Sequence, residues 1–196
     1  MERKRNYIYP DKDTLVAAFV CEFSNTLMEY AEEGRQLHIA LSGGSTPLSI
    51  FRQLAEQTSR EEWAHVSLYW GDERCVPPDD PESNYGNARK ALLDPMELDK
   101  DLVHRIRGEE NPAEEATRYG NELLKYLPGE SGFPVFDWIW LGLGADGHTA
   151  SIFPHEIELW TSGSPCVVAH HPVSGQNRIT LSGGVLNAAR RVTFIT

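Results

Sequence analysis

A histidine follows an aspartate by two residues in the glycine-rich stretch GLGADGHTASIFP, residues 142–154. A carboxylate beside an imidazole can orient the ring and raise its basicity, which suits a general base at neutral pH. Asp146 and His148 are therefore candidates for base catalysis. The same residues also fit an Asx turn with a capping histidine, and an isolated Asp-Gly-His favours that structural interpretation.

A second candidate is the stretch SGGSTP at residues 42–47. Gly43 and Gly44 leave main-chain N–H groups uncovered, and Ser45 and Thr46 add hydroxyl donors at the start of an expected helix. These are the elements of a phosphate cradle. An ordinary capped helix start explains them equally well. The pattern is not that of a P-loop, since no Gly-Lys-Ser/Thr follows.

A third candidate is the stretch GDERCVPPDDPESNYGNAR at residues 71–89, which directly follows an expected strand. Arg74 comes after two acidic residues, which could hold its guanidinium and present it to an oxyanion or a phosphate. A solvated strand end is the alternative interpretation. Ser83 and Asn84 are expected to cap the helix that begins near the next tyrosine.

The apolar patterns predict strands that alternate with helices. Helices are expected at residues 12–33, 48–57, 112–127 and 183–190, with a further one that starts near Tyr85. Strands are expected at residues 37–41, 66–70, 103–106, 136–141, 166–171, 178–182 and 192–196. We expect an α/β fold, a single Rossmann-like domain with a mostly parallel sheet and helices on both faces. Ligands bind beyond the carboxyl ends of such strands, so the three candidate stretches should share one rim.

The composition of this 196-residue chain limits the classes of partner that it can bind. A formal net charge of -11 argues against nucleic acid and against an acidic membrane surface. The three cysteines are widely spaced and odd in number, which fits a reducing compartment and gives no metal site. No secretory or membrane-spanning segment is evident, so we expect a cytoplasmic protein. The oligomeric state stays open.

Taken together and in this order, the motifs resemble those of the 6-phosphogluconolactonase family. The resemblance rests on SGGSTP, the Asp-Glu-Arg stretch with a downstream Ser-Asn, GLGADGHTASIFP and a late Arg-Ile-Thr, and it covers nearly the whole chain. It implies a catalytic pair, Asp146 and His148, with Arg74 at the active site. The other residues that it places at the substrate and its phosphate are Gly43, Gly44, Ser45, Thr46, Asp72, Asn84, Gly144 and Arg178.

The family's activity is hydrolysis of 6-phospho-D-glucono-1,5-lactone to 6-phospho-D-gluconate in the oxidative pentose phosphate pathway. The resemblance implies a small-molecule sugar phosphate lactone as partner, and no metal or other cofactor. One alternative is a deaminase-isomerase like those that act on glucosamine 6-phosphate, but these carry Asp-Glu-Tyr in place of Asp-Glu-Arg and a Glu in place of Phe153. Another is a non-catalytic sugar-phosphate sensor, which would need a DNA-binding segment.

One feature departs from the family pattern. Family members continue beyond the last apolar strand with a Gly-x-x-Lys turn, whose Lys is a phosphate ligand, and then a closing helix. The printed sequence ends at Thr196. We therefore expect a domain of residues 1–196 without that turn and helix.

Overall fold

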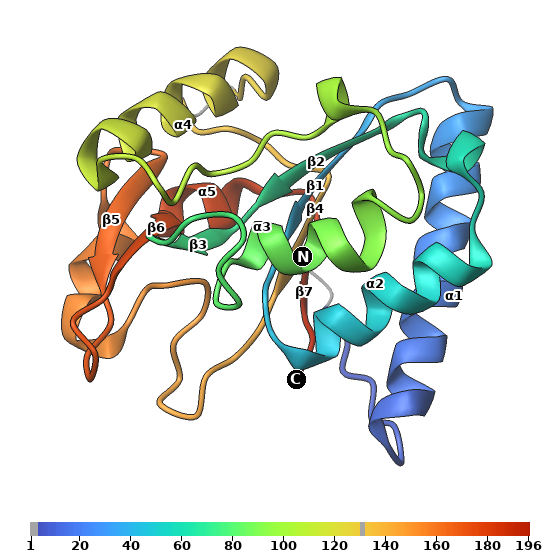
Figure 1. Cartoon of the computed structure of the whole chain (residues 1–196), viewed down its shortest axis with the longest axis horizontal. Coiled ribbons are helices and arrows are strands. Elements are labelled where there is room, and N and C mark those ends of the chain that lie inside the picture. Colours follow the sequence, from blue (N-terminus) through green and yellow to red (C-terminus); the bar gives the residue numbers. More distant parts are fainter. Residues whose placement is uncertain (1–3, 130–131) are drawn as a thin grey trace.

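The computed structural model describes residues 4–129 and 132–196 of the chain. Its main sheet is parallel, with the strand order β2-β1-β4-β7. A smaller antiparallel sheet has the order β3-β6-β5 and lies beside the main sheet (Figure 1). The strands are β1 Leu37–Leu41, β2 Val66–Trp70, β3 Asp72–Arg74, β4 Trp138–Leu141, β5 Cys166–His170, β6 Asn177–Leu181 and β7 Val192–Phe194.

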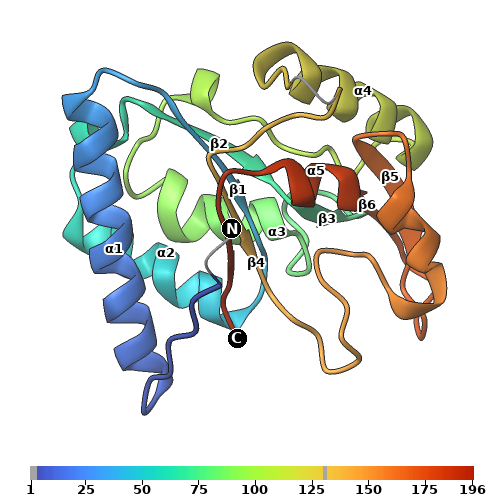
Figure 2. The same cartoon turned by 180° about the vertical axis from the view of Figure 1, so that it is seen from behind.

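Helices lie on both sides of the main sheet. The α-helices are α1 Lys12–Glu32, α2 Ser45–Gln57, α3 Asn84–Ala88, α4 Pro112–Tyr126 and α5 Gly183–Ala188. Short 3-10 helices span Arg60–Trp63, Lys100–Leu102 and Pro154–Thr161, and a π-helical turn at Arg89–Leu93 continues α3. Helices α1 and α2 lie on one side, and α4 and α5 on the other (Figures 1 and 2). In the part of the chain that the structure describes, no helix has the length and apolar character needed to cross a membrane.

Aromatic side chains join α1 to the main sheet. The rings of Phe19 and Phe23 meet the indole of Trp140 edge-on, with centroids 4.8 and 5.0 Å apart. Phe51 of α2 stacks on the same indole at 6.3 Å. Both tryptophans of β4 are fully buried, as the apolar run predicts. Aromatic side chains bury large areas, so this cluster holds the strand that leads to residues 142–154 in place.

The hydroxyl group of Tyr119 in helix α4 makes two hydrogen bonds with the main chain at the end of β2. The Tyr119 hydroxyl accepts a hydrogen bond from the Trp70 N–H at 3.0 Å and donates one to the Trp70 carbonyl at 3.1 Å. Burial raises the pKa of Tyr119 well above its ordinary value, so the hydroxyl keeps its proton. Both polar groups of the last residue of β2 are therefore satisfied by a helix instead of a strand.

The fold class is the one that the sequence predicts, but the predicted strand at residues 103–106 is wrong. Val103 makes one isolated parallel bridge with Leu68, and the His104 N–H donates to the Leu68 carbonyl at 2.8 Å. Beyond that point the segment pairs with α4: His104 Nδ1 contacts a Glu122 oxygen at 2.8 Å. Polar contacts with a helix therefore replace further strand pairing.

A second difference concerns residues 72–74, which are not among the predicted strands. They form β3, which pairs antiparallel with β6, so that Asp72 lies opposite Thr180 and Arg74 opposite Arg178. The predicted strands near residues 166–171 and 178–182 exist, but they belong to this smaller sheet. The connection between them is short, and short connections join antiparallel neighbours. The pairing brings two arginines side by side.

Candidate active site

The side chains of Asp146 and His148 form a direct pair. His148 Nδ1 lies 2.5 Å from Asp146 Oδ1, and the His148 N–H donates to the same oxygen at 3.2 Å. A carboxylate only accepts hydrogen bonds, so Nδ1 carries a proton and Nε2 of the neutral ring keeps its lone pair. The hydrogen bonds from the His148 side chain and backbone lower the pKa of Asp146. The Asx turn and the base-orienting pair are thus present together.

Glycines make room for this pair. The turn is closed by hydrogen bonds from the Gly144 N–H to the His148 carbonyl at 2.8 Å and from the Gly147 N–H to the Gly144 carbonyl at 2.9 Å. A Cβ on Gly144 would lie 2.2 Å from His148 Nδ1 and 2.8 Å from the nearer Asp146 oxygen. Gly147 has φ 87°, in the left-handed region. The imidazole therefore packs directly on the main chain.

An aromatic ring supports the imidazole from the protein interior. The ring of Phe153 is 2 % exposed and lies with its centroid 4.7 Å from that of His148. The same ring contacts the imidazole of His171 at 5.4 Å, edge-on. His148 keeps 30 % of its side chain exposed. It is thus held on one face and open to water on another.

The second candidate stretch forms the start of α2. Gly44 is the N-cap residue with φ 107°, and as a glycine it offers no side chain to cap the helix. The first N–H groups of a helix have no partner within it, and together with the helix dipole they favour an anion. Ser45 and Thr46 occupy the first two helical positions. Their N–H and hydroxyl groups can therefore receive a phosphate.

A lysine that the motifs do not single out lies beside this turn. Lys12 Nζ donates to the Ser45 carbonyl at 2.9 Å, across 33 residues of sequence. Lys12 is the first residue of α1, and its neighbours in the sequence do not predict this contact. It brings a positive charge to the start of α2.

Asn84 joins the first and third candidate stretches. A Cβ on Gly43 would lie 1.9 Å from Asn84 Oδ1, so only a glycine allows this approach. Asn84 Nδ2 donates to the Asp72 carbonyl at 2.9 Å and lies 3.3 Å from the Asp72 carboxylate. Ser83 is the cap of α3, as predicted, and accepts from the Gly86 N–H. Asn84 does not cap the helix; its side chain lies between Gly43 and Asp72 instead.

Asp72 and Ser151 join the third stretch to the His148 turn. Ser151 Oγ donates to Asp72 Oδ2 at 2.6 Å, and the Ser151 N–H donates to Thr180 Oγ1 at 3.1 Å. These three side chains are buried. Ala150, just before the serine, has φ 48°, which is costly for a residue with a Cβ. Ser151 is a site residue that sequence reasoning missed, since its partner is 79 positions away.

Glu73 holds the start of α3 against β3. Its buried carboxylate accepts from three main-chain N–H groups, those of Arg74, Asn84 and Tyr85, at 2.8, 2.7 and 2.7 Å. It also accepts from the Ser83 hydroxyl at 3.1 Å. Burial raises the pKa of Glu73, against the lowering effect of the three N–H donors. Sequence reasoning missed this role, since three of the four donors lie 10 to 12 positions downstream of Glu73.

Arg74 and Arg178 lie opposite each other in the smaller sheet. Arg178 is only 9 % exposed, and burial followed by the charge of Arg74 lowers its pKa. Among residues 4–129 and 132–196, neither Nε has a hydrogen-bond partner. Arg74 Nη1 donates to the Glu82 carbonyl at 2.5 Å. An anion bound here would satisfy the guanidinium groups and relieve their repulsion.

The three candidate stretches therefore meet, as the parallel-sheet argument predicts. Gly43 contacts Asn84, a Cβ on Gly142 would lie 3.9 Å from Ser42 Oγ, and Ser151 bonds Asp72. A cavity of about 660 Å³ lies elsewhere; Tyr85 and Arg89, at the end of the third stretch, line it, and the other residues named in this cluster do not. The cluster combines an oriented imidazole, two guanidinium groups and a helix start that suits an anion.

Known proteins resemble the chain over nearly all of its length. A family model described as glucosamine-6-phosphate isomerases/6-phosphogluconolactonase matches residues 10–196. The 6-phosphogluconolactonase of Treponema pallidum is 44% identical over 97% of this chain and 78% of its own length. The Haemophilus influenzae enzyme is 42% identical over 97% of this chain and 79% of its own length. The crystal structure of the devB protein has a TM-score of 0.88 and 43% identity, and the match covers 95% of this chain and 77% of that one.

Proposed function

The chain belongs to the glucosamine-6-phosphate isomerase/6-phosphogluconolactonase family, and we propose that the cluster around His148 is where it hydrolyses 6-phospho-D-glucono-1,5-lactone to 6-phospho-D-gluconate. Identity above 40% to two curated lactonases supports this reaction over amino-sugar deamination. The observation that carries the site assignment is the His148–Asp146 pair, fixed through Ser151 to the strand of Arg74.

His148 is the general base of the proposed mechanism. Asp146 holds the Nδ1 proton, so Nε2 takes a proton from a water molecule as the water oxygen attacks the lactone carbonyl carbon. The ring C–O bond of the tetrahedral intermediate then breaks, and the imidazolium returns the proton to the departing ring oxygen. Base assistance of this type contributes roughly 10²- to 10⁴-fold in rate. A lactone carbonyl is electrophilic enough to need no covalent enzyme nucleophile.

Positive charge and N–H donors at the site would stabilise two anionic groups, the oxyanion of the intermediate and the 6-phosphate. Arg74, with Arg178 beside it, would stabilise the oxyanion of the tetrahedral intermediate, a type of contribution worth about 3 kcal/mol. The start of α2 at residues 43–46 would hold the 6-phosphate through N–H and hydroxyl donors. Asn84 and Asp72 would fix the distance between these two positions and contact the sugar hydroxyl groups.

The position of Phe153 further supports the lactonase over the deaminase. Where the deaminase pattern has a glutamate, this chain has the apolar ring of Phe153. In the structure this ring packs on the imidazole of His148, so it supports the base without offering a second proton. The acid that would take part in the ring opening of an amino sugar is therefore missing at this position. The site is thus suited to a substrate that is already activated for attack by water.

The direct test is hydrolysis of lactone generated in situ, corrected for the spontaneous reaction. We expect a rate far above the spontaneous one and no release of ammonia from glucosamine 6-phosphate. Absence of acceleration by the folded protein would overturn the proposal. Inorganic phosphate should raise KM and leave kcat unchanged, because it occupies the 43–46 turn. Inhibition that does not compete with the lactone would contradict that placement of the phosphate.

A further inference from the structure

A polar cavity lies between the helical stretch that begins with α3, the segment 98–110 and helix α4, apart from the site described above. Its volume is about 660 Å³, within the range of small-molecule sites. Five of its lining side chains are cationic: Arg89, Lys100, Arg105, Arg107 and Arg118. Four are carboxylates: Asp94, Glu109, Glu110 and Glu122. With His104 neutral the lining has a net charge of +1, in a chain whose net charge is -11.

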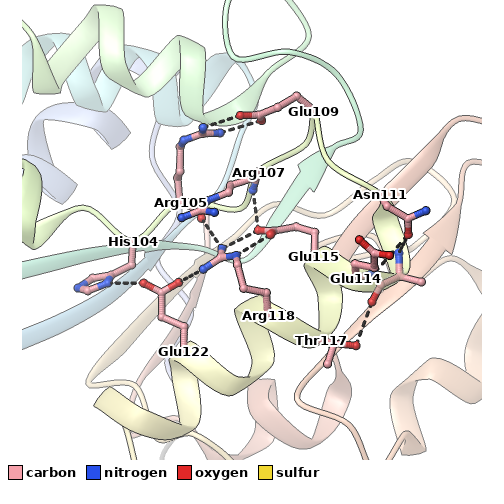
Figure 3. A network of polar contacts seen from close by, with 11 residues as sticks. His104, Arg105, Arg107, Glu109, Asn111, Glu114, Glu115, Thr117, Arg118 and Glu122 are labelled. Atoms are coloured by element: carbon pink, nitrogen blue, oxygen red, sulfur yellow. Dashed lines mark hydrogen bonds and ion pairs between the residues drawn. The ribbon is translucent and has the colours of Figure 1, made fainter.

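Three of the five cations are already neutralised by carboxylates. Figure 3 shows Arg105 bound to Glu109 through two N–H groups, at 2.8 and 2.5 Å. It also shows Arg118 between Glu115 and Glu122, with Nε 2.6 Å from a Glu115 oxygen. These pairs fix the wall of the cavity.

The third paired cation is Arg89, which contacts Asp79 at 2.7 Å and Asp94 at 3.6 Å. Its Nε is buried and has no hydrogen-bond partner in the part of the chain that the structure covers. That Nε is the atom 3.6 Å from Asp94, so both carboxylate contacts of Arg89 hold its guanidinium at the edge of the cavity.

The remaining two cations have no such pair. In residues 4–129 and 132–196, no carboxylate lies within ion-pair distance of Lys100 or Arg107. The Arg107 main-chain N–H is bound to Glu115 at 2.7 Å, so the backbone that carries this guanidinium is held (Figure 3). Two cations without a carboxylate partner thus line this cavity, and together they suit a ligand with more than one negative charge.

We propose that this cavity is a second binding site, for a small polyanion of the phosphate-ester or pyrophosphate class. Guanidinium groups pair with phosphate oxygens in a fork geometry, and an ammonium group adds a point charge. The concave shape favours a small molecule over a flat protein surface. The site contains none of the residues placed at the lactone, so it is separate from the hydrolytic site.

Inorganic pyrophosphate is a suitable probe, followed by amide shifts in NMR on the whole chain. We expect saturable shifts at residues 103–110 and, independently, at residues 43–46, where the catalytic site also accepts phosphate. The variant K100Q/R107Q should weaken binding at residues 103–110 by about tenfold or more and leave the other shifts and kcat unchanged. Sodium chloride at equal ionic strength should not reproduce the shifts, because screening alone is not site binding.

The matched control is R52Q/K90Q, which removes two positive charges from residues outside the cavity lining. It should leave pyrophosphate binding at residues 103–110 within about twofold of the original. Shifts confined to residues 43–46 would overturn the proposal, as would shifts that sodium chloride reproduces. Equal weakening by the control and the cavity variant would overturn it as well, since only net charge would then matter. Each of these outcomes leaves the lactonase assignment untouched.

Discussion

His148 and Asn84 face the same site, but they are held there in different ways. The His148 turn is closed by bonds among residues 142–152, and its Asp146–His148 pair is partly exposed. Asn84 lies in a buried network with Asp72 and Glu73, which joins β3 to the start of α3. The proposed base thus depends mainly on local geometry, whereas the position of Asn84 depends on tertiary contacts. Changes in the two regions should therefore have different signatures.

The largest effect on turnover should come from His148→Asn. The change removes the proton acceptor, so kcat should fall by roughly 10²- to 10⁴-fold, while thermal stability and phosphate binding change little. Steady-state kinetics measure the change in kcat, and thermal unfolding measures the change in stability. Asp146→Asn should lower kcat as well, through loss of the carboxylate that orients the ring.

The matched control is His65→Asn, since that histidine is exposed and is not part of the site. Its kcat should equal that of the original protein. If His148→Asn retained the full rate of hydrolysis, the Asp-Gly-His turn would be structural only, and the contrast between the two regions would have to be reassigned.

A smaller effect on turnover is expected from Gly144→Ala. The new Cβ would stand 2.2 Å from His148 Nδ1, so the imidazole must move. A displacement of about 1 Å in a reacting group costs on the order of 10²-fold in rate. The kinetic comparison should use Gly163→Ala as control, because a Cβ at that position meets no atom within 4 Å. Equal rates for the two variants would mean that the glycine is not needed to seat the base.

The smallest effect on turnover, and the largest on stability, should come from Glu73→Gln. A glutamine cannot accept at both terminal atoms, so at least one buried N–H loses its partner, at a cost of about 1–3 kcal/mol in the free energy of unfolding. At a temperature where the variant is folded, kcat should fall less than about tenfold. Urea unfolding measures this change in the free energy of unfolding. The control is Glu29→Gln, a substitution at an exposed position, which should leave the free energy of unfolding nearly unchanged. A catalytic loss as large as that of His148→Asn would remove the distinction between the regions.

The locally determined part of the candidate site can be recognised from the sequence. Both the glycine turn around His148 and the start of α2 are encoded by neighbouring residues, and turn and helix-start chemistry suffices to locate them. The partners of Ser151 and Glu73 are different. Ser151 bonds a residue 79 positions away, and Glu73 collects donors from two elements. No periodicity or local motif specifies such pairs, because they follow from how the two sheets are placed.

The sheet arrangement shows the same limit. Apolar runs correctly predict most strands, including β1, β2 and β4, since buried parallel strands are continuously hydrophobic. They do not say which strands pair. Residues 72–74 are too polar to be recognised as a strand, yet they pair with β6 and bring Arg74 opposite Arg178. The proposed oxyanion site thus depends on a pairing that only the folded chain reveals.

The hydroxyl of Tyr119 makes one amide a reporter for the docking of a helix. The Trp70 N–H is held by that hydroxyl and not by a neighbouring strand, so its exchange with deuterium requires the hydroxyl to move away, as it does when α4 lifts from the end of β2. The exchange of amides within the β1–β2 pairing follows the opening of the sheet itself. A comparison of the two rates would therefore distinguish the local release of α4 from global unfolding, with no substitution in the protein.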